Sequence, residues 1–240
     1  RVLDSIGNDT GLNTSQVVTF DTSAPATPTA PTSYNDNVGA ITNAASTAAV
    51  TDDTTPGLNV GTGLTDTPKL YVNGSAVAAT YDAVAGTLTP DVALADGAQA
   101  LTYTLTDVAG NESAQSGPLN LTVDTSGSNG SNDTALTGVA VTGITDDSGT
   151  AGDYITSDVD GLTVSGTVTG TVNGDIVQVS TDSGATWAAA TLTGNAWSFT
   201  DAATRSDGDT ATYQVRVLDS IGNDTGLNTS QVVTFDTSAP

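Results

Sequence analysis

"DTATYQVRVLDSIGNDTGLNTSQVVTF" (residues 209–235) is the stretch from which the fold can be worked out. Tyr213, Val215 and Val217 alternate with polar neighbours, which predicts a β-strand buried on one face. The opening "DTATY" has the D-x-A-x-Y form of a tyrosine corner, in which a tyrosine near the start of strand F bonds back to backbone at the preceding turn. The other interpretation of Tyr213 is an ordinary strand aromatic. We expect residues 216–240 to hold the end of strand F and strand G of a sandwich.

The same alternation continues through the rest of the chain. No segment keeps apolar residues at helical spacing over three turns, and Thr, Val, Gly, Asn and Asp suit short strands joined by tight turns. About seven such strands per ~100 residues predict an all-β protein made of tandem immunoglobulin-like Greek-key β-sandwich domains. The alternating positions outside the opening stretch are Leu101, Tyr103 and Leu105; Leu119, Leu121 and Val123; Leu162 and Val164; Val177 and Val179; and Trp197 and Phe199.

Residues 1–25 are identical to residues 216–240, an offset of 215 residues. An identical copy at that distance predicts a tandem array whose period is about 215 residues or a multiple of its parts. A weaker repeat pairs "YTLTDVAGNES" (103–113) with "VRVLDSIGNDT" (215–225), and "LTVDTS" (121–126) with "VTFDTS" (233–238). We therefore expect a strand F and G fragment of a preceding repeat (1–25), domain one (26–126), a linker (127–132) and domain two (133–240).

The N-terminal fragment carries apolar residues without the rest of their domain. We expect it either to fray or to dock on a neighbouring molecule, because unpaired strand edges invite pairing with another chain. The residues that would lack their core are Val2, Leu3, Val17, Val18 and Phe20.

Composition excludes several classes of function. With 27 acidic and 4 basic residues the net charge is -23, and nucleic acid needs a basic surface instead. The chain has no Cys and no His, so a zinc site or a Ser-His-Asp triad cannot be built. Aromatic residues make up 5% of the chain, too few for the platforms of a glycosidase cleft. From these missing residue types we expect that the chain is not an enzyme. No apolar run is long enough to span a bilayer, so we also expect no membrane insertion in this segment.

The acidic residues are almost all aspartate, Glu112 being the exception. Aspartate favours turns and is a hard oxygen ligand held close to the backbone. Two interpretations stand: a solvated acidic surface with aspartates in turns, or a surface that binds Ca²⁺ through six to eight oxygens. Calcium fits better than magnesium, which demands a tighter octahedron and keeps its waters.

Sandwich topology sorts these residues by domain end. The A-to-B loop, the E-to-F turn and the end of strand G lie at the exit end, whereas the B-to-C and F-to-G loops lie at the entry end, facing the preceding domain. We therefore expect Ca²⁺ where an exit end meets an entry end. The candidate ligands are Asp36, Asp52, Asp53 and Asp124 at the exit end of domain one; Asp219 and Asn223 at the entry end of domain two; Asp107 and Asn111 at the entry end of domain one, facing Asp21; and Asp146, Asp147, Asp153, Asp158, Asp160 and Asp236 at the exit end of domain two.

Three elements carry a resemblance to a known family: "TDDTTP" (51–56), "TDVAGN" (106–111) and "DTSAP" (21–25 and 236–240). In this order they resemble the bacterial immunoglobulin-like repeats of giant surface adhesins of the RTX and biofilm-associated type. The resemblance implies an extracellular protein on a Gram-negative cell surface, in which neighbouring repeats form a calcium-stiffened stalk, called an extender. The stalk would project a distal adhesive domain for cell attachment or biofilm formation. The glycine-rich nonapeptide of RTX proteins is absent.

A carbohydrate-binding or self-associating adhesion module is the alternative function. Sandwiches that bind sugars expose stacked aromatic side chains, and Trp187 and Trp197 are the only tryptophans. Trp197 alternates with Phe199, which favours a place in the core. Trp187, in "DSGATWAAA", is the position left for a sugar platform.

Overall fold

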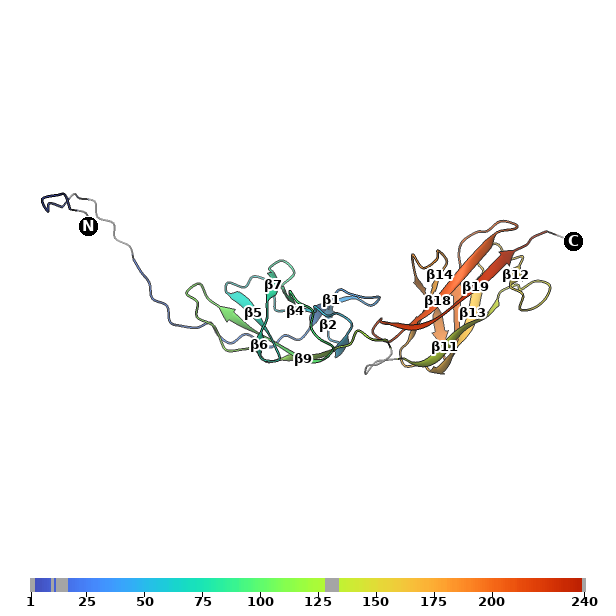
Figure 1. Ribbon diagram of the computed structural model, residues 1–240, viewed down its shortest axis with the longest axis horizontal. Helices are drawn as coiled ribbons and strands as arrows, with labels where there is room; N and C mark the ends of the chain where they lie inside the picture. Colours follow the sequence, from blue (N-terminus) through green and yellow to red (C-terminus); the bar gives the residue numbers. More distant parts are fainter. Residues whose placement is uncertain (1–2, 10, 12–16, 128–133, 239–240) are drawn as a thin grey trace.

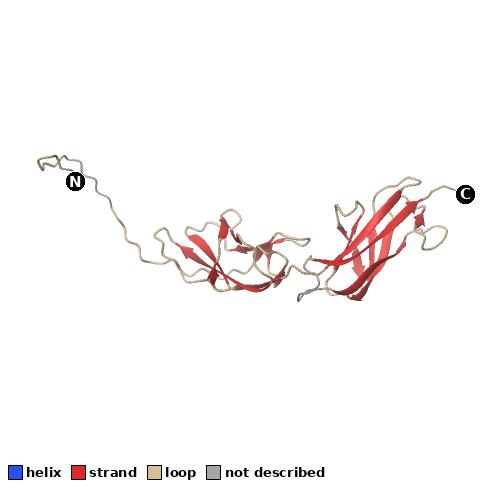
Figure 2. Ribbon diagram, in the orientation of Figure 1, coloured by secondary structure: helices blue, strands red, loops and turns tan. Residues whose placement is uncertain are grey.

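The computed structural model describes residues 3–9, 11, 17–127 and 134–238. Two β-sandwiches lie end to end, and residues 17–25 run away from the first sandwich on the side opposite the second (Figure 1). Within the described ranges every regular element is a strand (Figure 2), as the alternation predicted. No helix in that part of the chain is long and apolar enough to cross a membrane.

The first sandwich packs two five-stranded sheets. Two short strands pair in parallel, with Val123 opposite Thr51, and the remaining pairs are antiparallel. One sheet has the order β2 (Asn43–Ser46), β1 (Tyr34–Asp36), β4 (Gly57–Asn59), β8 (Thr87–Pro90) and β7 (Ala79–Asp82); the other has the order β3 (Val50–Thr51), β10 (Leu119–Val123), β9 (Gly97–Thr106), β5 (Thr67–Val72) and β6 (Ser75–Ala76).

The second sandwich repeats this plan with four and five strands. Its parallel pair places Thr156 opposite Phe235. In both sandwiches the sheets correspond to strands A, B, E, D and A′, G, F, C, C′ of an immunoglobulin-like fold, and in the first sandwich β2 is an additional strand beside strand A. The orders are β11 (Ala135–Ile144), β13 (Thr163–Thr171), β17 (Ala196–Thr200) and β16 (Thr191–Thr193); and β12 (Ile155–Thr156), β19 (Asp224–Phe235), β18 (Thr210–Leu218), β14 (Ile176–Ser180) and β15 (Ala188–Ala189).

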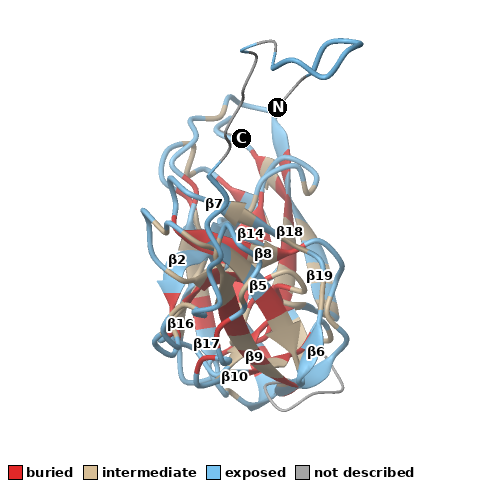
Figure 3. Cartoon of the chain, turned by 90° about the vertical axis from the view of Figure 1, so that its left-hand side faces the viewer, coloured by how far each residue is buried: buried red, intermediate tan, exposed pale blue. Residues whose placement is uncertain are grey.

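Each sandwich buries its own core between its two sheets, and Figure 3 shows buried residues on the strands and exposed residues mainly on the loops. Trp197 is 2% exposed in the second core, which confirms its predicted place. Burial of a large apolar side chain contributes roughly 1.5–3 kcal/mol, so these residues dominate the stability of each unit. The first core contains Tyr34, Leu58, Leu70, Leu88, Leu101, Tyr103, Leu121 and Val123; the second contains Val164, Val177, Val179, Trp197, Tyr213, Val215, Val217, Val233 and Phe235, among others.

The tyrosine corner is bonded differently from the expectation. Tyr213 is fully buried, but its hydroxyl donates to Asp201 Oδ2 (2.9 Å) and not to backbone. Arg205 Nη2 donates to the same oxygen (2.7 Å), and the guanidinium lies 5.9 Å from the centre of the Phe235 ring. The D-x-A-x-Y pattern predicted the buried tyrosine. Its partner, Asp201, lies in the turn between β17 and β18 and comes near Tyr213 only when the chain folds.

The described residues of the N-terminal fragment lie against neither core. Leu3 is half exposed, and Val17, Val18 and Phe20 expose two thirds or more of their side-chain surface. These residues are thus not folded against the second sandwich. Val2 and residues 128–132 of the expected linker lie outside the described residues.

Candidate metal centre at the joint between the sandwiches

The loop between β18 and β19 is closed by one aspartate. Asp219 Oδ1 accepts hydrogen bonds from the backbone N–H groups of Ile221 (3.0 Å), Gly222 (2.8 Å) and Asn223 (2.9 Å). Its Oδ2 accepts one from Asn223 Nδ2 (3.1 Å). Gly222 has φ +107°, a conformation that favours glycine. The sequence D-x-x-G-N thus folds this loop by itself, because every bond lies within five residues.

The same loop occurs at two further D-x-x-G-N sequences. Asn111 Nδ2 donates to Asp107 Oδ2 (2.9 Å), and its backbone N–H donates to Asp107 Oδ1 (2.8 Å). In the N-terminal fragment, Asn8 makes the equivalent bonds to Asp4 (3.0 and 2.8 Å). Hydrogen bonds from the asparagines lower the pKa of Asp107 and of Asp4 below the ordinary value. The loop forms even at residues 4–8, where no sandwich surrounds it.

In both sandwiches, the asparagine that ends the D-x-x-G-N loop also donates a hydrogen bond to the preceding segment of the chain. Asn223 Nδ2 donates to the backbone oxygen of Asp124 (2.9 Å), directly after β10. Asn111 Nδ2 donates to the backbone oxygen of Asp21 (3.1 Å). Asp21 and Asp124 occupy the same place in "FDTS" (20–23) and "VDTS" (123–126). The entry end of each sandwich therefore holds the end of a preceding strand G sequence.

The exit end of the first sandwich collects four buried aspartates. Asp36, Asp52, Asp53 and Asp124 are all less than 10% exposed. Thr51 Oγ1 donates to Asp36 Oδ2 (3.0 Å), and Asp53 caps its own turn through the N–H of residue 55 (2.7 Å). Three buried carboxylate oxygens have no hydrogen-bond partner: Asp36 Oδ1, Asp52 Oδ1 and Asp124 Oδ2.

Electrostatic repulsion crosses the joint. Burial, followed by the negative charges of Asp36, Asp53 and Asp219, raises the pKa of Asp52 from 3.8 to about 6. Asp219 belongs to the second sandwich, so its carboxylate lies close enough to Asp52 to disfavour ionisation there. The Asp52 carboxylate packs so closely on Gly39 that a Cβ there would lie 1.9 Å from Asp52 Oδ2. Glycine at this position leaves the space that the carboxylate occupies.

Asp175 is a further buried aspartate at the entry end of the second sandwich, and it is not among the ligands predicted from the sequence. It is 6% exposed, and its Oδ1 is buried without a hydrogen-bond partner. Ile176 pairs with Leu218 across β14 and β18, so continuing the register by one residue places Asp175 opposite Asp219. Period-two alternation with Val177 and Val179 puts Asp175 on the core-facing side of its strand, a signal that was available in the sequence.

The joint therefore combines buried carboxylates from two sandwiches, and none of the described basic residues forms an ion pair with them. In the described part of the chain the basic side chains pair elsewhere: Lys69 with Glu112, Arg205 with Asp201 and Arg216 with Asp224. Buried, uncompensated charge is strongly unfavourable, and a hard divalent cation is the ligand that such oxygens suit. As the side chains stand, no group of three or more Asp or Glu among the described residues is arranged to hold a metal ion.

The remaining predicted ligands lie at the two outer ends. Asp21 is exposed beside Asp107 and Asn111 at the entry end of the first sandwich. At the exit end of the second sandwich, Asp147 Oδ1 is buried and unpartnered, while its Oδ2 accepts from the N–H of Gly152 (2.6 Å). The other predicted aspartates of that end are exposed or half-buried: Asp146, Asp153, Asp158, Asp160 and Asp236. Three of them, Asp153, Asp158 and Asp236, cap turns.

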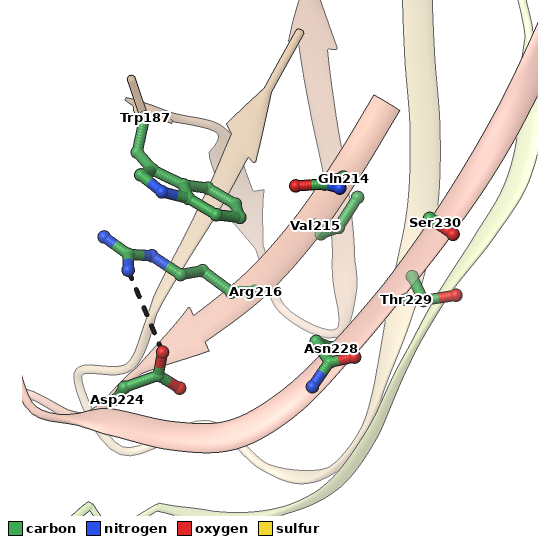
Figure 4. Close-up of a pocket in the computed structure, with 8 residues that line it drawn as sticks. All are labelled: Trp187, Gln214, Val215, Arg216, Asp224, Asn228, Thr229 and Ser230. Carbon is green, nitrogen blue, oxygen red and sulfur yellow. Dashed lines mark ion pairs between the residues drawn. The ribbon is translucent and has the colours of Figure 1, made fainter. Parts of the chain in front are cut away.

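A shallow pocket of about 430 Å³ lies on the β18 and β19 side of the second sandwich (Figure 4). Trp187 borders it, but the Arg216 guanidinium stacks 4.2 Å from the centre of its ring. The indole N–H donates to the backbone oxygen of Gly184 (3.1 Å), and Arg216 is held by Gln178 Oε1 (2.8 Å). One ring face and the indole donor are therefore engaged within the protein, which disfavours Trp187 as a sugar platform.

Comparison with known proteins gives a family match for the first sandwich. Residues 27–125 match the model of the bacterial Ig-like domain. Together with the strand orders above, this match makes the chain an all-β protein built of immunoglobulin-like sandwiches. No curated protein matches the chain.

Three solved structures that match this chain have low sequence identity to it. The fibronectin(III)-like modules of Clostridium thermocellum CbhA align over 91% of this chain and 93% of theirs, with 12% identity and a TM-score of 0.43. A tetra-tandem repeat from the extending region of a large adhesion protein aligns over 78% of this chain and 46% of its own, with 19% identity and a TM-score of 0.28. The Bacteroides ovatus protein SGBP-B, solved with a mixed-linkage heptasaccharide, aligns over 78% and 43%, with 14% identity and a TM-score of 0.26. The chain spans less than half the length of these last two structures.

Proposed function

We propose that this chain is a calcium-stiffened spacer of a large, repetitive bacterial surface adhesin of the RTX or biofilm-associated type. Its sandwiches would form part of an extracellular stalk that projects a distal adhesive domain. The bacterial Ig-like match over 27–125 and the identical copies at 1–25 and 216–240 support a repetitive surface protein. The neighbouring repeats of the same chain would be its partners.

One observation carries the calcium part of the proposal. Four buried carboxylate oxygens without hydrogen-bond partners lie on the facing ends of the two sandwiches: Asp36 Oδ1, Asp52 Oδ1 and Asp124 Oδ2 on the first and Asp175 Oδ1 on the second. Buried polar groups are nearly always partnered, so this concentration supports the proposal that a positive ligand binds here. Calcium binds carboxylate oxygens in flexible geometry, which would allow the side chains to turn onto it.

Stiffening follows from where the cation would lie. A cation bound by aspartates of both sandwiches restricts the angle between them. Without it, the repulsion between Asp52 and its neighbouring carboxylates, which adds to the effect of burial on the pKa of Asp52, and the net charge of -23 push the sandwiches apart. This repulsion is screened by salt over a Debye length of about 8 Å at physiological ionic strength, so low salt would exaggerate the effect.

Small-angle X-ray scattering with and without calcium tests the proposal. We expect an excess of chelator to increase interdomain flexibility and to lower the melting temperature, and calcium to restore both. Magnesium at the same concentration is the matched ion control and should restore less. Superimposable scattering profiles in calcium and chelator would refute calcium stiffening.

A charge-matched pair of variants locates the site. Asp36→Asn removes a ligand at the joint, whereas Asp91→Asn removes the same charge from an exposed position. Calcium titration by calorimetry should show weaker binding for Asp36→Asn and unchanged binding for Asp91→Asn. Equal losses in both variants would mean that calcium binds diffusely to the acidic surface.

A further inference from the structure

An equivalent hydrogen bond forms at two joints, each of which is the place where the end of a strand G sequence meets the entry end of the following sandwich. Asn223 donates to the backbone oxygen of Asp124 (2.9 Å), and Asn111 donates to that of Asp21 (3.1 Å). We propose that the D-x-x-G-N loop is a preformed docking element that binds the extended end of strand G from any preceding immunoglobulin-like repeat. It fastens the two repeats through the asparagine amide, without a cation. This inference is independent of calcium binding.

The asparagine side chain is oriented by its own loop before the preceding strand binds. Its Nδ2 carries two N–H donors, and in the second sandwich one is used on Asp219 Oδ2 (3.1 Å) and the other on Asp124 O (2.9 Å). The first bond belongs to the loop itself, and the loop forms in isolation at residues 4–8. Because the side chain is already oriented, little rotamer entropy is lost when it binds the preceding strand.

The acceptor is a backbone carbonyl, which any residue provides. The residue that carries this carbonyl group follows Val123 in one joint and Phe20 in the other, and the loop binds both. The aspartate at this position bends the chain through its own side chain, which accepts from the N–H two residues later at both Asp21 (3.0 Å) and Asp124 (3.2 Å). The partner is thus defined as a strand G end followed by an Asp-Thr-Ser turn, and not by a particular core residue.

The two bonds differ in what surrounds them. Asp21 is exposed, and Asn111 binds it on the segment that runs away from the first sandwich (Figure 1). In the other joint the same loop also packs on the first sandwich: a Cβ on Gly222 would lie 3.4 Å from the backbone nitrogens of Ala40 and Ile41. Fastening by asparagine is common to both joints, whereas packing is added at one.

Distance measurement by double electron–electron resonance tests this proposal on the full chain. The chain has no cysteine, so Val84→Cys and Val232→Cys, both at exposed positions, label one sandwich each. In chelator, Asn223→Ala should broaden the distance distribution between the labels, with a roughly two- to tenfold larger share of undocked conformers, as expected for one lost hydrogen bond. Asn228→Ala is the control, because Asn228 bonds only within its own sandwich, to Gly226 (3.0 Å).

Two comparisons separate fastening from calcium binding and from misfolding. Tryptophan fluorescence should show that Asn223→Ala retains a folded second sandwich. In the same chelator, Asn111→Ala should increase the fast backbone motion of residues 20–23 in nuclear magnetic resonance relaxation. Distance distributions of Asn223→Ala and wild type that superimpose in chelator would overturn the proposal, whether or not calcium stiffens the joint.

Discussion

Neutralising Asp52 tests the electrostatics of the joint most directly. Its pKa is raised from 3.8 to about 6 by burial and by three neighbouring carboxylates. A raised carboxyl pKa means that the unfolded state releases its proton first, so the stability of the first sandwich falls as pH rises from about 4 through about 6. The difference corresponds to about 3 kcal/mol, since one pKa unit is about 1.4 kcal/mol. Asp52→Asn keeps the shape of the side chain and removes the charge.

We therefore expect Asp52→Asn to stabilise the first sandwich by up to about 3 kcal/mol at pH 8 in chelator. At pH 3, below the ordinary carboxyl pKa of 3.8, Asp52 is mostly protonated in both the folded and the unfolded state, so variant and wild type should have similar stability. In calcium the stability difference between variant and wild type should shrink or change sign, because the variant loses a cation ligand. Asp91→Asn is the control for loss of one negative charge, and we expect its stability to equal that of wild type at both pH values.

The two sandwiches can be followed separately in one sample. Both tryptophans lie in the second sandwich, and the first has tyrosines only, among them Tyr34 and Tyr103 in its core. Urea unfolding followed by tryptophan fluorescence therefore reports the second sandwich, and near-ultraviolet circular dichroism of tyrosine reports mainly the first. If Asp52→Asn is no more stable than wild type at pH 8 in chelator, the repulsion inferred at the joint is wrong.

Three further variants probe the residues around this site. Tyr213→Phe removes a hydrogen bond to the buried Asp201 carboxylate and should destabilise the second sandwich by about 1–3 kcal/mol in tryptophan-detected urea unfolding, with the first sandwich unchanged. Asp175→Asn should weaken calcium binding in calorimetric titration while leaving the fold intact; full affinity in this variant would exclude Asp175 as a ligand. Gly222→Ala strains a left-handed position (φ +107°) and should cost about 1 kcal/mol or more and loosen the joint, seen as a broader distance distribution between the sandwiches.

Strand positions could be predicted from the sequence because their signal is local. Alternation at Tyr213, Val215 and Val217 reflects the period of two in a strand, and all three residues are buried in the second core. The D-x-x-G-N loops are also local, since their hydrogen bonds span at most five residues. Sandwich topology then sufficed to bring Asp52 and Asp219, which are far apart in sequence, to the same joint.

Contacts between segments distant in sequence could not be predicted. Tyr213 was expected to bond to backbone, but it bonds to Asp201, whose carboxylate also carries the Arg205 guanidinium. Asp175 shares the alternation of Val177 and Val179, but its place opposite Asp219 depends on the register between β14 and β18. Trp187 was left open, and only the fold brings Arg216 onto its ring.

By itself, the sequence determined the all-β fold, the internal repeat and the loop geometry, because periodicity, copied segments and short-range hydrogen bonds are written in neighbouring residues. The tertiary structure alone decided which aspartates are buried and which are solvated turn caps. Burial depends on what packs against a residue from elsewhere in the chain, and it sets both the raised pKa of Asp52 and the unpartnered oxygens of the joint. The backbone oxygens that Asn111 and Asn223 bind were likewise decided by the fold, since a carbonyl group has no signature in the sequence.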